Sequence, residues 1–143
     1  MDKKELTKRY NEFLKKEKLT NKQAWVGAGG TLLLLDLRSS TQDIDLGVPK
    51  DIFDKIRSRG LPEHIFNGDT IVIEYDEVID LHIDHGYEEH TIIEGVGSWS
   101  PEEVLRLKER LNRPKDQLDI KNIKNYLKNN TATESLHNLI FRW

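Results

Sequence analysis

The sequence predicts an α+β domain in which a small mixed β-sheet is flanked by helices. Two observations predict this class. Short β-rich segments and longer stretches of helical periodicity alternate along the chain. The 143 residues are the size of one ordinary domain, and no internal repeat or low-complexity linker divides them. We therefore expect one domain over residues 1–143, with a helical N-terminus over 1–20, a core over 21–95 and C-terminal helices over 100–143.

The first half of the chain alternates helices with strands. The expected elements are a helix over 3–18, a strand over 24–26, a short buried helix over 31–37, a strand over 43–48 and a helix over 51–60. Leu6, Tyr10 and Phe13 recur at helical spacing in the first of these elements. Pro49 ends the second strand, and Asp51 can cap the helix that follows it.

The second half predicts a β-hairpin followed by helices. The expected elements are strands over 70–75 and 78–84, an edge strand over 91–93, a helix from 101 that Pro114 breaks, a helix to about 128 and a last short helix from 133 or 135. Ser100 followed by Pro101 and Glu103 is a helix start with a capping box. Asn129 and Asn130 are expected to end the penultimate helix, and the apolar residues 139–143 to pack on the core.

Composition excludes several classes of protein. Charged residues make up 33% of the chain and hydrophobic residues 36%, which is typical of a soluble protein. A net charge of −3 gives no overall basic signal for nucleic acid, so RNA would need a local patch. The chain has no cysteine, which excludes disulfides and thiolate metal sites. The first residues are charged and do not resemble a secretory signal, so we expect none, and no apolar run reaches about 20 residues. We expect a cytoplasmic protein with no membrane partner, and the sequence does not indicate its oligomeric state.

The chemistry of the chain is concentrated at aspartates on strands. Asp43 and Asp45 point the same way because side chains alternate along a strand. Two adjacent carboxylates repel each other unless a cation lies between them, and Mg²⁺ prefers such hard oxygen ligands. The glycines upstream of them, Gly29 and Gly30, can offer backbone N–H groups to phosphates.

A third carboxylate is expected from the hairpin. Asp80 lies mid-strand and faces away from the apolar side of that strand. Beside the first pair it would complete a cluster around two Mg²⁺ ions about 4 Å apart, an arrangement that catalyses phosphoryl transfer. Asp84 and His82 share its face as weaker candidates. Taken alone, each of these features has an ordinary explanation. Aspartates on a strand are typical of a solvated face, and a glycine pair is typical of a tight turn.

The order of these residues resembles a known superfamily. The resemblance rests on Gly29, Gly30, Thr31, Leu32, Arg38, Thr41, Asp43, Asp45 and Asp80, and on a second block of Lys108, Arg113, Pro114, Lys115, Asp116 and Asp119. Together they resemble the nucleotidyltransferases of the DNA polymerase β type, in particular minimal and AbiEii-like toxin-type members. The resemblance covers residues 24–127.

The resemblance implies a nucleotidyltransferase fold and an enzyme that transfers a nucleoside monophosphate from an NTP to a hydroxyl, with Mg²⁺ or Mn²⁺ as cofactor. Asp43 and Asp45 would bind both metals, and Asp80 would bind the catalytic metal and help deprotonate the acceptor. Gly29 and Gly30 would hold the β- and γ-phosphates.

The same resemblance implies further nucleotide contacts. Thr31, Arg38 and Thr41 belong to the nucleotide-binding loop, and Arg38 and Lys108 would face the triphosphate or the acceptor, where cations offset negative charge. Asp116 is expected to be structural, as an ion pair with Arg113 or Lys115, or as a cap of the following helix.

Three questions stay open at the level of sequence. The acceptor is a tRNA 3′ end, a protein side chain or a small molecule, and a toxin-like or phage-defence role follows by resemblance only. A catalytically silent, antitoxin-like binding module is the alternative. A zinc-type site among His82, His85, His90, Asp80 and Asp84 is a further alternative, although His82 and His85 would point to opposite faces of a regular strand.

Overall fold

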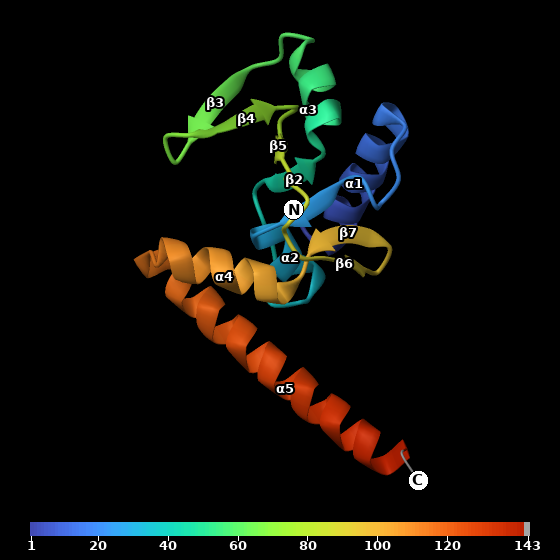
Figure 1. Ribbon diagram of the computed structural model, residues 1–143, viewed down its shortest axis with the longest axis vertical. Coiled ribbons are helices and arrows are strands. Elements are labelled where there is room, and N and C mark those ends of the chain that lie inside the picture. Colours follow the sequence, from blue (N-terminus) through green and yellow to red (C-terminus); the bar gives the residue numbers. More distant parts are fainter. Residues whose placement is uncertain (142–143) are drawn as a thin grey trace. The chain divides into compact units, whose positions relative to one another are not determined.

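The computed structural model describes residues 1–141, and the side chains of residues 1–130. It divides into two compact units, residues 1–100 and the segment from Pro101 onward. Unit 1 contains α1 (Lys3–Glu17), β1 (Trp25–Gly27), α2 (Gly29–Leu34), β2 (Ile44–Val48), α3 (Lys50–Arg57), β3 (Glu63–Phe66), β4 (Thr70–Glu74), β5 (Ile79–Ile83), β6 (His90–Ile93) and β7 (Val96–Trp99) (Figure 1). Unit 2 contains α4 (Pro101–Leu111), a 3₁₀ turn η1 (Pro114–Asp116) and α5 (Gln117–Phe141).

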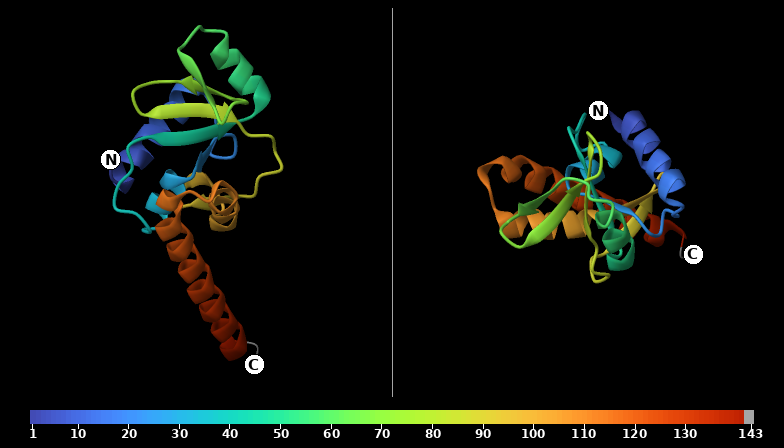
Figure 2. Two further views of the ribbon diagram at one scale, coloured as in Figure 1. Left: turned by 90° about the vertical axis from the view of Figure 1, so that its left-hand side faces the viewer. Right: turned by 90° about the horizontal axis from the view of Figure 1, so that it is seen from above.

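The seven strands form one mixed sheet, so the predicted α+β class is confirmed. The strand order is β3-β4-β5-β2-β1-β7-β6. The pairs β2–β5 and β1–β7 are parallel and the other four are antiparallel. Figure 2 shows β2 and β5 side by side. The predicted hairpin is confirmed as β4–β5, and the predicted edge strand as β6.

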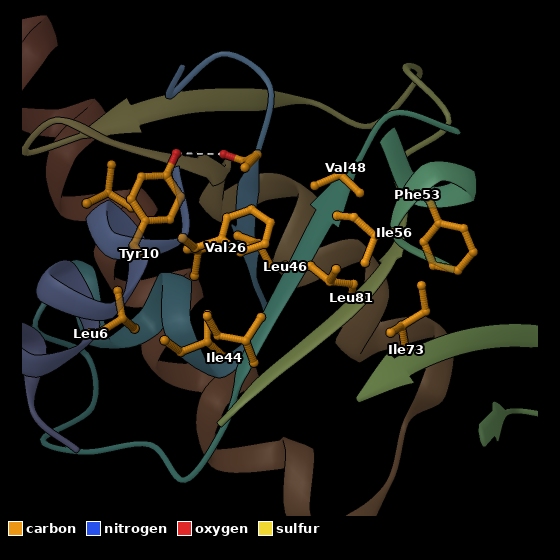
Figure 3. Close-up of a cluster of buried hydrophobic side chains, with 14 of the residues drawn as sticks. Leu6, Tyr10, Val26, Ile44, Leu46, Val48, Phe53, Ile56, Ile73 and Leu81 are labelled. Carbon is orange, nitrogen blue, oxygen red and sulfur yellow. Dashed lines mark hydrogen bonds between the residues drawn. The ribbon is translucent and has the colours of Figure 1, made fainter. Parts of the chain in front are cut away.

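One face of the sheet in unit 1 is buried under helices. Apolar side chains from α1, α2, α3 and five strands form a single core cluster. Figure 3 labels Leu6, Tyr10, Val26, Ile44, Leu46, Val48, Phe53, Ile56, Ile73 and Leu81. The Tyr10 hydroxyl donates to the Ala24 carbonyl at 2.7 Å, which ties α1 to the start of β1. Because Ile44, Leu46 and Val48 all face this core, Asp45 must point to the opposite side of the sheet.

Four expectations about local structure need correction. Two strands were not expected: β3 is an exposed edge, and β7 carries glycine and serine, which have low strand propensity. The helix after Pro49 begins at Lys50, so Asp51 lies in its first turn and is not its cap. The short buried helix α2 begins at Gly29 and ends at Leu34, earlier than expected at both ends.

The fourth correction concerns the C-terminal helix. Residues 117–141 form one continuous helix, so Asn129 and Asn130 do not end it. Asparagine costs a helix interior only about 0.7 kcal/mol, and neither glycine nor proline follows to break the hydrogen-bond ladder. The packing expected for residues 139–143 lies outside the described residues. Within the described part of the chain, each helix is too short or too polar to cross a membrane.

Candidate metal and nucleotide site

The parallel pairing of β2 with β5 brings two of the predicted aspartates together. Asp45 is the register partner of Asp80, and both point away from the core because their strand neighbours face it. On the other side of β2, Asp45 pairs with Gly27 at the end of β1. The predicted carboxylates therefore lie beside the turn that leads into the predicted phosphate loop.

The aspartate cluster, defined as Asp43, Asp45 and Asp80, has a negative electrostatic environment. Asp43 directly precedes β2 and is exposed, as is Asp45, whereas Asp80 is half-buried. Burial raises the pKa of the Asp80 carboxyl, and the negative charge of Asp43 raises it further. Among the described residues, these three carboxylates do not all converge within 4.8 Å, in contrast to a second group described below.

The predicted loop residues Gly29, Arg38 and Thr41 meet beside this cluster. A Cβ built on Gly29 would lie 2.5 Å from Arg38 Nη1 and 3.3 Å from Thr41 Oγ1. Glycine at this position therefore leaves room for the Arg38 guanidinium against the helix start, and a larger residue would displace it. The Thr41 hydroxyl donates to the Asp43 carbonyl at 3.1 Å, which links this segment to the aspartate cluster.

The turn before Gly29 is strained. Ala28 has φ 50° and ψ −121°, outside the regions that non-glycine residues populate readily. Such a conformation costs on the order of 1–3 kcal/mol and persists only where the surrounding structure enforces it. Strain of this kind is concentrated at ligand sites and switches.

Gly30 and Thr31 have structural contacts in the interior. A Cβ on Gly30 would overlap Val26 Cγ1, so the glycine allows α2 to pack on β1. The fully buried Thr31 hydroxyl donates to the Val26 carbonyl at 3.2 Å and lies 3.0 Å from Ser98 Oγ. The Thr31 side chain is therefore directed into the fold, and only backbone atoms of these two residues are suited to contact a phosphate.

Lys108 lies in unit 2 within what we call the lysine cluster: Lys108, Arg113, Asp116 and Asp119. Its Nζ is 3.3 Å from Asp116 Oδ1 and 3.1 Å from Asp119 Oδ2. Arg113 binds both oxygens of Asp116, with Nε–Oδ2 at 2.8 Å and Nη2–Oδ1 at 3.0 Å. Lys108, Asp116 and Asp119 are all buried.

These contacts make the second sequence block a structural element. Arg113 and Lys108 hold the pKa of the Asp116 carboxyl well below its usual range. Asp116 Oδ2 also accepts the Arg113 backbone N–H at 3.1 Å and caps the 3₁₀ turn. The expected Arg113–Asp116 ion pair is confirmed. The expectation that Lys108 faces a triphosphate stays a prediction, and its ammonium is already paired with two buried carboxylates.

Only some residues of the alternative zinc-type site lie close together in the structure. Asp84 and His90 lie together, and Glu88 joins them, so that one ligand atom from each falls within 4.8 Å of the others. His82 is not part of this group, although its Nε2 and Asp84 Oδ2 both lie beside Gly47, 3.0 Å and 3.4 Å from where a Cβ would be. Its ring is edge-on to Trp99 at 6.2 Å between ring centroids, and burial lowers its pKa to about 4. His85 lies against Tyr87 in the loop that follows β5, with 5.5 Å between ring centroids.

Glu88 is the candidate ligand that sequence reasoning missed. It lies in an irregular loop, where no periodicity assigns a direction to a side chain, and pairs of acidic residues are common in such loops. Its one signal is its position two residues before His90.

Comparisons of the chain with protein-family models, with curated proteins and with solved structures gave no match.

Proposed function

We propose that this protein is a metal-dependent nucleotidyltransferase that moves a nucleoside monophosphate from an NTP to a hydroxyl acceptor. The observation that carries the proposal is the register pairing of Asp45 with Asp80 on adjacent parallel strands, next to Asp43. Three carboxylates on one side of a sheet suit Mg²⁺ or Mn²⁺, which favour oxygen ligands. Bound metal would polarise the phosphoryl group and stabilise the leaving pyrophosphate.

The protein residues have separate roles in this reaction. The acceptor oxygen forms a bond to the α-phosphorus, the bond from that phosphorus to the bridging oxygen breaks, and pyrophosphate leaves. Asp80 accepts the proton of the acceptor hydroxyl, a role that a raised pKa favours. Asp43 and Asp45 would hold the metal.

The loop beside the aspartate cluster is suited to the triphosphate. Gly29 leaves space beside the Arg38 guanidinium, and a guanidinium binds phosphate oxygens in a bidentate manner. The strain at Ala28 is consistent with a turn shaped for a ligand. The acceptor class, namely a tRNA 3′ end, a protein or a small molecule, and a toxin-like or phage-defence role remain part of the proposal by resemblance.

A label-transfer assay tests this proposal. The protein is incubated with each α-labelled NTP, Mg²⁺ or Mn²⁺, and a cell extract that contains RNA. Asp43→Asn/Asp45→Asn is expected to reduce transfer by at least about 10²-fold, because it removes charge that holds the metal at the reacting phosphate. Asp51→Asn is the matched control, since Asp51 is exposed on α3 outside the aspartate cluster.

Two results would contradict the proposal. Transfer that survives the double substitution would place the chemistry elsewhere. Absence of transfer, together with absence of metal-dependent NTP binding in calorimetry, would favour a catalytically silent binding module.

A further inference from the structure

A second group of metal-ligating side chains lies at the opposite end of β5 from Asp80. Asp84 follows β5, His90 opens β6 and Glu88 lies in the loop between them. One ligand atom from each lies within 4.8 Å of the other two. Four residues of strand span about 13 Å, so this histidine cluster (Asp84, Glu88 and His90) is separate from the aspartate cluster.

Asp84 and His90 are held in fixed positions. Asp84 Oδ2 lies 2.7 Å from His90 Nε2, and the Asp84 side chain is 1% exposed. The His90 ring stacks on Trp25 with centroids 4.0 Å apart and an interplanar angle of 9°. The stack fixes the ring plane and leaves the edge with Nε2 directed at the carboxylate. Ligands fixed in this way lose little conformational entropy when they bind a metal.

Glu88 is held by the backbone of the same loop. Its Oε2 accepts the N–H groups of His85 and Gly86, each at 3.1 Å. The Gly86 N–H also donates to Asp84 Oδ1 at 3.0 Å. The loop therefore folds around the two carboxylates and brings them together.

The basic side chains beside these two carboxylates are histidines. Within residues 1–130, the one side chain that ion-pairs with Asp84 is His90, and no lysine or arginine pairs with Glu88. Two adjacent carboxyl groups repel each other when both are ionised, and a divalent cation between them would offset that repulsion.

We infer that Asp84, Glu88 and His90 bind a divalent transition metal of the zinc type. An imidazole ligand favours zinc-like metals over Mg²⁺ and Ca²⁺. Zinc bonds to nitrogen and oxygen of about 2.0–2.2 Å place tetrahedral ligand atoms about 3.4 Å apart. The ligand atoms lie within 4.8 Å of one another, so the widest separation must close by at most about 1.4 Å. The pair of Asp84 and His90 must open by about 0.7 Å as the metal replaces their hydrogen bond.

Three protein ligands leave the fourth zinc position for water or another small ligand. The bound metal would tie the end of β5 to the start of β6 and fix the loop between them. The inference does not depend on nucleotidyl transfer, because it uses none of the residues assigned to that reaction.

Metal titration of the whole chain tests the inference. Protein stripped with EDTA and dialysed is titrated with Zn²⁺ by calorimetry and with Co²⁺ by visible absorption. We expect one tight equivalent and a zinc-dependent rise in Tm for the native chain. Glu88→Gln and His90→Gln are each expected to weaken binding at least about tenfold. The Glu88→Gln amide oxygen can still accept the two loop N–H groups, so this variant is expected to fold, and thermal melting in EDTA checks it.

Two control proteins locate the metal. His85→Gln changes a neighbouring exposed histidine outside the cluster, and it should bind zinc as the native chain does. Asp43→Asn/Asp45→Asn should also keep the tight equivalent. The inference is overturned if the native chain binds no tight equivalent, if Glu88→Gln and His90→Gln bind as tightly as it does, or if the aspartate double variant loses the site. None of these outcomes bears on label transfer, so the two proposals fail separately.

Discussion

The aspartate cluster of unit 1 and the lysine cluster of unit 2 differ in how their negative charges are balanced. In the lysine cluster, two buried aspartates share the ammonium of Lys108, and one of them also binds a guanidinium. In the aspartate cluster, the strongest influences on Asp80 are burial and a neighbouring carboxylate, and both raise its pKa. The pKa of Asp116 moves in the opposite direction.

This difference separates a structural ion cluster from the proposed metal site. Carboxylates that the chain has already paired with its own cations gain little from an added metal ion, and removing a partner destabilises the fold. Carboxylates that repel one another cost stability without a metal and gain binding energy with it. Sequence spacing singled out both groups, and their charge balance distinguishes them.

The largest expected effect comes from removing the cation of the lysine cluster. Lys108→Met leaves Asp119 buried without the ammonium that it contacts at 3.1 Å. We expect the free energy of unfolding of α4 and α5 to fall by roughly 3–5 kcal/mol, the usual cost of breaking a buried ion pair. Hydrogen exchange of the backbone amides in α4 and α5 measures this loss of stability.

The double variant Lys108→Met/Asp119→Asn is the control for this prediction. It removes the buried charge as well as its partner, so it should recover much of the lost stability. Normal stability of Lys108→Met, together with weaker NTP binding in both variants, would instead assign Lys108 to the triphosphate.

A smaller effect, with a defined pH dependence, is expected for Asp116→Asn. The substitution weakens charge-assisted hydrogen bonds to Arg113 and Lys108, and it should lower the free energy of unfolding by about 1.5–3 kcal/mol at pH 7. The pKa of Asp116 is lowered in the folded state, so its stabilising effect is complete above the usual aspartate value of 3.8 and is lost as pH falls below it.

Urea unfolding of both proteins at several pH values measures this difference. The difference in the free energy of unfolding between the native chain and the variant should be constant from neutral pH to about pH 5. It should become smaller below the usual aspartate pKa. If this difference stays constant into that acidic range, Asp116 stabilises the fold through the shape of its side chain and not through its negative charge.

Much of the fold could be predicted because local patterns and tertiary structure agree. The alternation at residues 79–83 places Ile79 and Leu81 in the core and Asp80 on the opposite face, as the strand period requires. The helical spacing of Leu6, Tyr10 and Phe13 likewise places all three in the core. These positions depend on periodicity alone, which the sequence displays directly.

The rest depends on pairings that no local pattern records. The sequence suggests that Asp45 and Asp80 share a site, but their register arises from β2 pairing with β5, two strands far apart in the chain. β7 has little strand propensity and forms between β1 and β6, which pair with it. Lys108 is similar: a lysine on a helix is typical of a solvated surface, and only the return of α5 buries it beside Asp116.

The smallest expected effect on stability has the opposite sign to the first two. In EDTA at pH 7, Asp80→Asn should raise the free energy of unfolding by up to about 1 kcal/mol, because burial and the nearby charge of Asp43 both disfavour an ionised carboxylate at this position. The pKa of Asp80 is raised in the folded state, so ionisation costs stability as pH rises, and the advantage of the variant should shrink as pH falls toward the usual aspartate pKa.

Added Mg²⁺ should reverse this order of stability, so that the native chain becomes more stable than Asp80→Asn. Added Mg²⁺ is expected to raise the Tm of the native chain more than that of Asp80→Asn, since the ion binds the folded state with all three carboxylates. Asp69→Asn, in the turn between β3 and β4, is the control and should follow the native chain under both conditions. If Asp80→Asn is less stable than the native chain in EDTA and both respond equally to Mg²⁺, the aspartate cluster is a structural element like the lysine cluster, and the contrast between the two units disappears.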